Sequence, residues 1–414
     1  MAQEHIVVGI DIGTHYVYTV VAAVSAEAPL PQIIGIGRAR SYGIRRGTII
    51  DLDDAATAVA ESVREAEQSA GVKIERAFLS IDGNHIVSLP SRGVVAVSRA
   101  DGEISDDDVT RVITAAQTVA LPPNREILHT LPFEYIVDNE GGLRDVAGMN
   151  GLRLEANALI VGGSSGHIKN LERCASSNNI QIDGLVLAPL AAANAVASKR
   201  QKELGVLVLD IGGGTTGLAV FEEGNLLYTN VLPMGGDNIT NDLAIGLRTT
   251  IEVAERIKRE YGAALVSEVA KTDRIDLSKF DPKEKDLVLR RDVVEIIEAR
   301  MSEIFEVVNK ELRKIGKEAM LPGGVVLVGG SSKIPYAVDL CKSKLRLPAQ
   351  VGFPRNVEGI VGSVDDPSFA TVIGLVFWGL ERSNYQRARI AMPNLTSFGG
   401  SVDKLRGWMR AFLP

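Results

Sequence analysis

Cysteine is scarce in this chain of 414 residues, which contains only Cys174 and Cys341. A disulfide framework needs several paired cysteines, and a structural zinc site built on thiolates needs about four ligands. Each of the two cysteines stands alone in a helix-like segment. The sequence therefore predicts neither a disulfide-stapled fold nor a cysteine metal site, and it favours a reducing, cytoplasmic compartment.

Long hydrophobic runs are also missing. The longest uncharged apolar stretch, residues 369–380, falls short of the ~20 residues that a membrane-spanning helix needs. The chain starts without the basic region of a secretory leader, so a cleavable signal peptide is not expected. We expect no segment to cross a bilayer.

Basic and aromatic residues are too few for a general nucleic-acid binder. The formal net charge is −7 and aromatic residues make up 5% of the chain, whereas nucleic-acid binding needs a positive surface that displaces counterions. We therefore expect no nucleic-acid partner. Residues 382–414, however, carry six basic side chains and one acidic one, which leaves −12 on the rest of the chain. This reversal marks the tail as a separate functional unit.

Hydrophobic residues are plentiful at 45%, enough for two or more compact lobes, and one motif occurs twice. An apolar run at 6–10 leads into Asp11-Ile-Gly13-Thr14, and a second run at 206–209 leads into Asp210-Ile-Gly-Gly-Gly-Thr-Thr216. A further β-rich stretch follows each motif, at 16–24 and at 218–221. Each copy is typical of a hairpin with glycine at the turn.

The pentapeptide Val-Gly-Gly-Ser-Ser also occurs twice, at 161–165 and at 328–332. Both copies follow a hydrophobic strand and precede a helical pattern. A glycine hairpin followed by this pentapeptide in both halves indicates two related α/β lobes with a ligand site between them. Apolar strands such as 325–328 are typical of a sheet covered on both faces by helices.

Glycines at a hairpin turn let backbone N–H groups face a phosphate without an intervening side chain. Gly13 with Thr14, and residues 212–215, would then grip a phosphate chain from opposite lobes. Carboxylates beside phosphates need a divalent cation between them, and Mg²⁺ keeps several waters while using few protein carboxylates. Asp11 and Asp210 are therefore the candidate magnesium residues, acting through water.

The glycines are open to two other interpretations. Gly212-x-Gly214-x-x-Gly217 formally matches a dinucleotide fingerprint, but that site requires a helix to open at the glycines, and residues 218–221 have the pattern of a strand. A purely structural role in tight turns fits any single motif. It does not explain several motifs in a repeated order.

These motifs resemble the phosphate loops and adenosine loop of the actin and heat-shock chaperone ATPases. The resemblance implies an actin-like duplicated ATPase fold of the α/β class, with two lobes around a cleft that binds ATP and Mg²⁺. In this interpretation Glu255 and Lys258 reach the ribose and adenine, although an i,i+3 charge pair also stabilises any exposed helix. The residues assigned to the nucleotide are Gly13, Thr14, His15, Gly212, Gly213, Gly214, Thr215, Thr216, Gly235, Gly236, Glu255, Lys258, Gly329, Gly330, Ser331 and Lys333.

The sequence departs from the hydrolytic members of that superfamily at two positions. Where they carry a Glu-Pro pair whose glutamate activates water, this chain has Ala188-Pro189, and Gly217 stands where the chaperone pattern has an aspartate. Loss of a general base costs ~10²- to 10⁴-fold in rate. We expect tight nucleotide binding, slow hydrolysis at most, and a nucleotide that acts as an assembly switch.

Residues 84–160 form a candidate insertion with the order strand, helix, strand, strand, in which Ser105 precedes the helix as an N-cap. This segment resembles the inserted subdomain of the FtsA family of bacterial cell-division proteins, which contacts the next subunit or later division proteins. A merely structural insertion is the alternative. The resemblance also places the FtsZ C-terminal peptide on a small subdomain at 237–300, where Arg300 matches a family residue but also fits a solvated helix charge.

The tail predicts a tether and an amphipathic helix. Residues 383–400 are polar and contain Pro393, Gly399 and Gly400, whereas 401–414 place an apolar face opposite basic residues. Such a helix is typical of a membrane surface, with packing against the body as the alternative. The membrane residues are Val402, Lys404, Leu405, Arg406, Trp408, Met409, Arg410, Phe412 and Leu413.

The whole sequence, from residue 6 to 414, thus resembles the FtsA family. That resemblance implies a polymer-forming adaptor on the cytoplasmic side of the membrane, with itself, FtsZ, anionic lipids and later division proteins as partners. Another actin-fold scaffold, MreB-like or of a type IV pilus, and a sugar kinase of the same superfamily remain the alternatives. The first lobe is expected at 1–83 and 161–200, with the insertion at 84–160 and a return of the chain to this lobe at 361–382. The second lobe is expected at 201–236 and 301–360, with its small subdomain at 237–300. The flexible linker follows at 383–400 and the amphipathic helix at 401–414.

Overall fold

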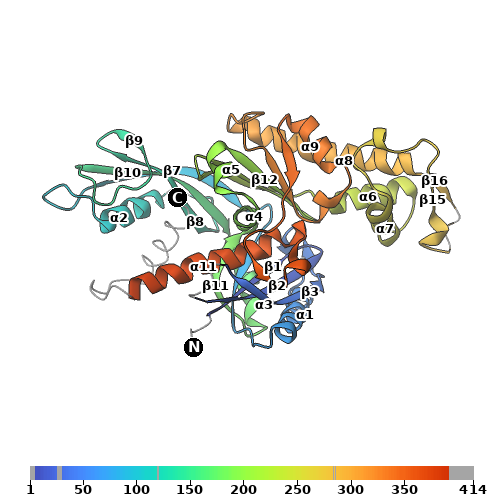
Figure 1. The fold of residues 1–414 in the computed structure, drawn as a ribbon, viewed down its shortest axis with the longest axis horizontal. Coiled ribbons are helices and arrows are strands. Elements are labelled where there is room, and N and C mark those ends of the chain that lie inside the picture. Colours follow the sequence, from blue (N-terminus) through green and yellow to red (C-terminus); the bar gives the residue numbers. More distant parts are fainter. Residues whose placement is uncertain (1–4, 26–29, 119–120, 283, 285, 391–414) are drawn as a thin grey trace.

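The computed structural model describes residues 5–25, 30–118, 121–282, 284 and 286–390. Two sheet-containing lobes meet at the centre of the molecule, and two smaller units extend from them in opposite directions (Figure 1). Within the described residues, no helix has the length and apolar character needed to span a membrane.

The first lobe is built on a six-stranded sheet with the order β11-β6-β1-β2-β3-β19. β1 pairs antiparallel with β2 and β2 with β3, whereas β6 lies parallel to both β1 and β11. The strands are β1 His5–Ile12, β2 Tyr16–Val24, β3 Gln32–Arg40, β6 Arg76–Ile81, β11 Gln181–Leu187 and β19 Glu358–Gly359.

The second lobe repeats this arrangement in the order β14-β13-β12-β17-β18. β12 pairs antiparallel with β13 and β13 with β14, whereas β17 lies parallel to both β12 and β18. The duplication predicted from the glycine hairpins is therefore confirmed at the level of sheet topology. The strands are β12 Val206–Ile211, β13 Thr216–Glu222, β14 Asn225–Leu232, β17 Val325–Val328 and β18 Ala349–Val351.

The pentapeptide repeat has a different meaning from the one predicted. The second copy follows β17 in the core sheet, but the first copy ends the strand Arg153–Ser164 (β10), which pairs only with β7 and β8 of the insertion. The first-lobe strand that corresponds to β17 is β6, which leads into Asp82-Gly83. The two pentapeptides therefore do not occupy equivalent positions, because sequence identity alone carries no information on strand partners.

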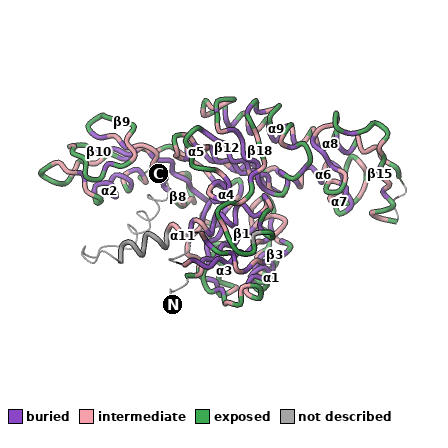
Figure 2. The backbone as a smooth tube through the Cα atoms, viewed as in Figure 1, coloured by how far each residue is buried: buried purple, intermediate pink, exposed green. Residues whose placement is uncertain are grey.

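Helices cover the two sheets and bury apolar side chains against them, and the buried residues concentrate in the strands between them (Figure 2). In α1, alanine and valine recur on the buried face, Asp51 caps the N-terminus and Gly71 ends the helix at φ 70°. The helices against these sheets are α1 Leu52–Ala70, α3 Ser165–Ser176, α4 Ala188–Val196, α5 Lys199–Leu204, α8 Arg290–Lys314, α9 Ala337–Leu345 and α11 Ala370–Ile390.

The insertion forms a separate four-stranded sheet, β7-β10-β8-β9, with α2 packed on it and its own small core. Ser105 caps α2 through a capping box with Asp108. The predicted order of strand, helix, strand, strand is confirmed, and the turn-rich segment after β8 adds the short strand β9. The bounds are β7 Val87–Ala96, α2 Asp106–Ala116, β8 Arg125–Val137 and β9 Glu140–Leu143.

The second lobe carries a charged, helical unit between β14 and the end of α8. Its elements are α6 Gly236–Leu247, α7 Ile251–Tyr261, the 3-10 turns Val266–Glu268 and Leu277–Lys279, and the strand pair β15 Arg274–Asp276 and β16 Leu287–Leu289. Five short elements complete the described chain. They are β4 Ile44–Arg45, β5 Thr48–Ile49, α10 Val361–Val364 and the 3-10 turns Gly330–Lys333 and Pro367–Phe369.

The C-terminal helix is longer than predicted. α11 continues to Ile390, so the first eight residues of the expected tether, 383–390, are helical. These residues contain neither glycine nor proline, and the first breaker is Pro393. The polar composition of this segment therefore did not mean a loss of helical backbone. The rest of the tether and the predicted amphipathic helix at 401–414 lie outside the described residues.

Candidate functional site

The two glycine turns have the same backbone geometry. Gly13 donates its N–H to the carbonyl of Tyr16 at 3.1 Å, and Gly212 donates to the carbonyl of Thr215 at 2.9 Å. Asp11 faces Tyr18 across the first hairpin, and Asp210 faces Gly217 across the second. Each aspartate therefore occupies the same register position in its hairpin, two residues before the first glycine of the turn.

A cleft of about 620 Å³ lies between the lobes and receives both turns. This volume is within the range of small-molecule sites, about 300–1,000 Å³. Fifteen of the predicted nucleotide and metal residues line it, namely Asp11, Gly13, Thr14, His15, Asp210, Gly212, Gly213, Thr215, Gly236, Glu255, Lys258, Gly329, Gly330, Ser331 and Lys333. Residues from segments far apart in the sequence thus converge on one cavity.

Three predicted residues, Gly214, Thr216 and Gly235, are absent from the lining and contact neighbouring segments instead. A Cβ on Gly214 would lie 2.7 Å from the Thr14 hydroxyl oxygen, and one on Gly235 would lie 2.6 Å from the carbonyl oxygen of Gly213. Thr216 donates its hydroxyl to the carbonyl of Met234 at 2.8 Å. These residues let neighbouring backbone segments approach closely, which the glycine pattern alone did not separate from ligand contact.

The N-terminus of α6 packs against the second turn and leaves the turn amides open. Gly236 and Asp237 donate their N–H groups to the carbonyls of Gly212 and Gly213, at 2.9 and 2.8 Å. The N–H groups of Gly213 and Thr14 make no hydrogen bond within the described residues. The turns, rather than the helix start, therefore present free donors to an anion.

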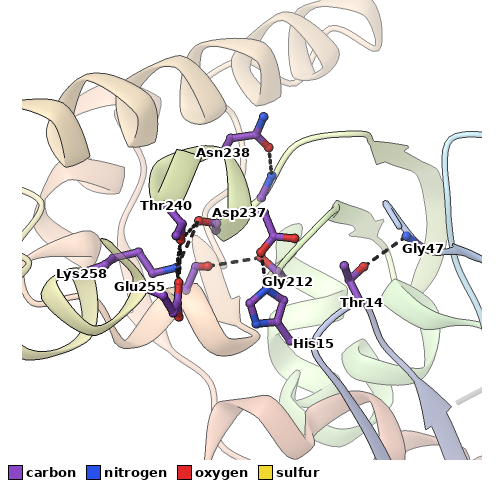
Figure 3. A network of polar contacts seen from close by, with 12 residues as sticks. Thr14, His15, Gly47, Gly212, Asp237, Asn238, Thr240, Glu255 and Lys258 are labelled. Atoms are coloured by element: carbon purple, nitrogen blue, oxygen red, sulfur yellow. Dashed lines mark hydrogen bonds and ion pairs between the residues drawn. The ribbon is translucent and has the colours of Figure 1, made fainter. Parts of the chain in front are cut away.

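His15 reaches across the cleft from the first turn and bonds the Asp237 carboxylate through Nε2 (Figure 3). Both side chains are about one-third exposed. The interlobe contact thus lies at the position where the two turns face each other, and a phosphate chain entering the cleft has to accommodate it.

Three half-buried carboxylates converge at the floor of the cleft. Asp11 accepts a hydrogen bond from the Ser80 hydroxyl at 2.6 Å, and Asp210 accepts one from the Thr371 hydroxyl at 3.0 Å. Burial raises the pKa of Asp11 to about 6. Burial, together with the charges of Asp11 and Asp82, raises the pKa of Asp210 to about 7. These carboxylates repel one another, so the site favours a cation.

Asp82 is the third of these carboxylates, and sequence reasoning missed it. Its Oδ2 accepts a hydrogen bond from the Thr215 hydroxyl at 2.6 Å, and burial raises its pKa. The available signal was an aspartate directly after the buried strand 76–81, which only the parallel pairing with β1 places beside Asp11. Among the described residues, no group of three or more His, Cys, Asp or Glu is arranged to ligate a metal directly. The carboxylates therefore suit a hydrated Mg²⁺ held through water.

Arg38 and Arg40 also line the cleft and were not singled out from the sequence. Both lie on β3, two residues apart, so they point to the same face of the sheet. They bring positive charge to the rim of a cavity whose floor is acidic. An alternating Arg-Ala-Arg run at the end of a strand was the available signal.

Glu255 and Lys258 pair with each other on α7 at 2.5 Å, and both contact the Thr240 hydroxyl on α6 (Figure 3). Lys258 also donates to the carbonyl of Gly236 at 3.1 Å. The lysine side chain is only 10% exposed. The pair therefore links two helices and faces the cavity, which distinguishes it from an i,i+3 charge pair on an open helix surface.

The segment after β17 closes the cleft on the second lobe. Gly329 has φ 82°, and a Cβ there would overlap the Asp210 carboxylate. Ser331 donates its hydroxyl to the carbonyl of Gly212 at 3.2 Å, and Lys333 pairs with Asp366 at 2.8 Å. The glycine thus permits the close approach of this segment to the second turn.

The segment that connects the lobes contributes no carboxylate to the cleft. Ala188 opens α4 and lines the cavity together with Pro189. Gly217 lies against that proline, since a Cβ on Gly217 would be 3.1 Å from the nearest proline carbon. Both departures from the hydrolytic pattern therefore face the cavity.

Arg300 lies outside the cleft, on α8. Its guanidinium forms a two-point ion pair with Asp242 on α6, at 2.6 and 3.0 Å, and also contacts Glu303. The side chain is 23% exposed. Arg300 therefore holds α6 against α8, which differs from a freely solvated helix charge. The predicted membrane residues between 402 and 413 lie outside the described residues.

Two family models match the chain. The model "Cell division protein FtsA" matches residues 207–374, and the model "SHS2 domain inserted in FTSA" matches residues 83–162. The first covers much of the second lobe with its half of the cleft, and the second covers the four-stranded insertion.

Curated cell-division proteins named FtsA are similar to this chain over most of its length. The FtsA of Pseudomonas aeruginosa is 38% identical over 378 residues, which span 91% of this chain and 90% of the relative. The FtsA of Bacillus subtilis is 36% identical over 94% of this chain and 87% of its own length, and that of Borreliella burgdorferi is 35% identical over 98% of both.

Solved structures at lower identity share the fold. A type IV pilus biogenesis complex, PilM-PilN, matches with a TM-score of 0.66 and 15% identity, over 90% of this chain and 98% of the matched one. MreB5 of Spiroplasma citri bound to ADP matches with a TM-score of 0.54 and 12% identity, over 93% and 98%. These likenesses support an actin-like ATPase fold. The sequence relatives add the family, since identities of 35–38% extend over nearly the whole chain: it belongs to the FtsA family of cell-division proteins.

Proposed function

We propose that this protein binds ATP and Mg²⁺ in the interlobe cleft and uses the bound nucleotide as a switch for assembly during cell division. The observation that carries the proposal is the pair of matching glycine turns, which present free N–H groups to one cavity from opposite lobes. A chain of phosphates between the turns would bring the lobes together. Nucleotide binding would thus set their relative position.

The cation follows from charge. Asp11 and Asp210 lie buried at the floor of the cleft, and both would be ionised beside a triphosphate only if positive charge lay between them. When bound, Mg²⁺ would keep several of its water ligands and would offset the negative charge of the phosphates and carboxylates. Asp11 and Asp210 would hold it through those waters.

The adenosine would lie on the second-lobe side of the turns. Glu255 and Lys258 face the cavity there, and Gly329, Gly330 and Ser331 close it from the other side. Ala188 leaves the cleft without the carboxylate that activates water in hydrolytic members. The protein would therefore hold ATP for long periods and hydrolyse it slowly at most.

Membrane attachment would come from the tail. Basic side chains near an anionic bilayer contribute about 1 kcal/mol each, so Lys404, Arg406 and Arg410 together with the apolar face give reversible binding of one copy. A filament that presents many tails raises the effective concentration and can increase avidity by ~10²-fold. Polymerisation of the protein and its recruitment to the cytoplasmic face of the membrane would then reinforce each other.

The partners would be distributed over the two peripheral units. The unit at 237–300 is the proposed site for the C-terminal peptide of FtsZ, and the insertion is the proposed site for the next subunit or later division proteins. Arg300 would contribute by keeping α6 and α8 aligned, because its guanidinium is engaged with Asp242. The protein would in this way tether the FtsZ ring to the membrane.

The first test is ATP titration of the purified protein with and without Mg²⁺. Asp210→Asn keeps the shape of the side chain and removes its charge, so the Mg²⁺-dependent affinity for ATP should fall by about 10- to 100-fold. Asp53→Asn, at an exposed site on α1, is the matched control and should bind like the wild type. Equal affinity for Asp210→Asn and wild type would remove Asp210 from the site.

The second test is sedimentation with liposomes that contain anionic lipid. Trp408→Glu should release the protein into the supernatant while ATP binding stays unchanged, because a charge on the apolar face opposes burial in the bilayer. Trp408→Phe keeps an apolar ring and should still sediment. Undiminished sedimentation of Trp408→Glu would reject the tail as the anchor.

A further inference from the structure

We propose that Asp82 is a third carboxylate of the magnesium site, holding a water of the hydrated ion through Oδ1 while Oδ2 keeps Thr215 in place. The inference rests on the proposed binding of Mg²⁺ and ATP in this cleft, and deepens it by adding a residue from the first lobe that touches the second. No sequence motif pointed to this residue.

The duplicated topology places Asp82 at a defined position. Asp11 and Asp210 correspond because their hairpins share one register, and the parallel neighbours β6 and β17 bring Ser80 and Val328 beside them. Asp82 then corresponds to Gly330, which lines the cleft in the second lobe. The equivalent position after this strand is therefore a glycine in the second lobe and an aspartate in the first lobe.

One oxygen of Asp82 is buried without a partner. Oδ1 is shielded from solvent and makes no hydrogen bond within the described residues, although the residue as a whole is only half-buried and lines the cavity. A buried carboxylate oxygen without a partner is unfavourable, because it has lost its hydrogen bonds to water and has gained none in the protein. Asp11 and Asp210 differ in this respect, because among the described residues neither of them has a buried side-chain oxygen without a hydrogen-bond partner.

The other oxygen of Asp82 connects the two lobes. Thr215 donates its hydroxyl to Oδ2 at 2.6 Å, and its own carbonyl closes the second glycine turn by accepting the Gly212 N–H at 2.9 Å. The Asp82 carboxylate would therefore link the hydrated ion, through Oδ1, to the second glycine turn, through Oδ2 and Thr215. That turn presents the N–H groups that would donate to the phosphates. Occupancy of the ion would be sensed by both lobes at once.

The identity of the missing partner follows from charge. Asp82 lies close enough to Asp11 and Asp210 for its charge to raise the pKa of both, and an incoming triphosphate adds more negative charge. A neutral donor would satisfy Oδ1 but leave this repulsion in place. The waters of a hydrated Mg²⁺ do both, because they donate hydrogen bonds and the ion neutralises the surrounding carboxylates.

The test measures ATP binding by the full-length protein across a series of Mg²⁺ concentrations and again in EDTA. Asp82→Asn should raise the Mg²⁺ concentration for half-maximal binding by about 10-fold, the effect expected for a group that holds a metal-bound water. In EDTA the same variant should bind ATP at least as tightly as wild type, because one negative charge beside the phosphates is gone. A purely structural role would weaken binding under both conditions.

Two further variants isolate the contact between the lobes. Thr215→Val loses the hydroxyl and should raise the Mg²⁺ requirement by roughly fivefold, whereas Thr215→Ser keeps it and should restore wild-type behaviour. Asp53→Asn is the charge control. A wild-type Mg²⁺ requirement for Asp82→Asn, or a loss of ATP affinity in EDTA, would overturn the inference and leave the proposed function standing. Absence of ATP binding by the wild-type protein would overturn both.

Discussion

The two halves of the cleft share a backbone but differ in side chains. Both present an aspartate, a turn closed by the same hydrogen bond and a parallel strand beside it. The first half adds His15 in its turn and Asp82 at its strand end, whereas the second has Gly214 and Gly330 at those positions. The two lobes thus share a backbone arrangement. At two equivalent positions the first lobe has a polar side chain and the second lobe has glycine.

The largest expected effect is on stability, and it comes from adding a side chain at a glycine in the second lobe. Gly329→Ala would force a Cβ onto the Asp210 carboxylate at a position with φ 82°, and should reduce the free energy of unfolding by roughly 2–4 kcal/mol. Gly362→Ala, where a Cβ meets nothing within 4 Å, is the control and should stay near wild type. Urea unfolding measures both, and equal midpoints would show that the second half tolerates side chains after all.

A second change restores the carboxylate that the cleft lacks. Ala188→Glu should raise the rate of ATP hydrolysis by ~10²-fold, because a general base would again face the cavity from α4. Ala188→Gln has the same size without the base and should stay slow. Phosphate release under saturating Mg²⁺ and ATP is the measurement. A Gln variant as fast as the Glu variant would mean that side-chain bulk, and not proton transfer, changes the rate.

Acid sensitivity should belong to the half that carries the insertion. His129 on β8 accepts the Leu187 N–H at 3.0 Å, and burial lowers its pKa to about 4. The unfolded chain takes up this proton near pH 6.5 and the folded chain does not, so stability is complete above pH 6.5 and falls as the pH drops toward 4.

This single group should account for roughly 2 kcal/mol of lost stability between pH 7.5 and pH 5. His129→Gln cannot take up the proton, so its free energy of unfolding should fall by that much less over the same interval. Urea unfolding at the two pH values measures the difference. The same decrease in both proteins would assign the acid sensitivity to other groups, such as His85, whose pKa burial also lowers to about 4.

The smallest effect concerns the acid beside the second turn. Asp237 has no counterpart at the first turn, and its carboxylate faces the cleft next to Gly213. Asp237→Asn should strengthen ATP binding about threefold or less, because the charge of a side chain that is about one-third exposed is partly screened by solvent. Glu252→Gln, in the first turn of α7, is the control. Weaker binding by Asp237→Asn would show that its contact with His15 favours ATP binding.

Local rules recovered much of the fold from the sequence. Continuous apolar runs and the β-rich stretches after them located the strands of both hairpins, and Ser105 located the start of α2. The extension of α11 to Ile390 differs from the predicted tether, because polar residues alone do not end a helix. The pentapeptide at 161–165 was taken for a core repeat, although its strand belongs to the insertion. Strand partners depend on contacts between distant residues, which no local pattern encodes.

The sequence alone determined which kinds of residue form the cleft. Tight turns need glycine in any fold, and carboxylates beside phosphates need a cation in any fold. The tertiary structure decided which residues share the cavity. It moved Gly214, Thr216 and Gly235 behind the lining, brought Arg38 and Arg40 to the rim, and placed Asp82 across from Thr215. The physical reason is that parallel pairing of β6 with β1 joins residues about seventy positions apart, and only the assembled sheet makes them neighbours.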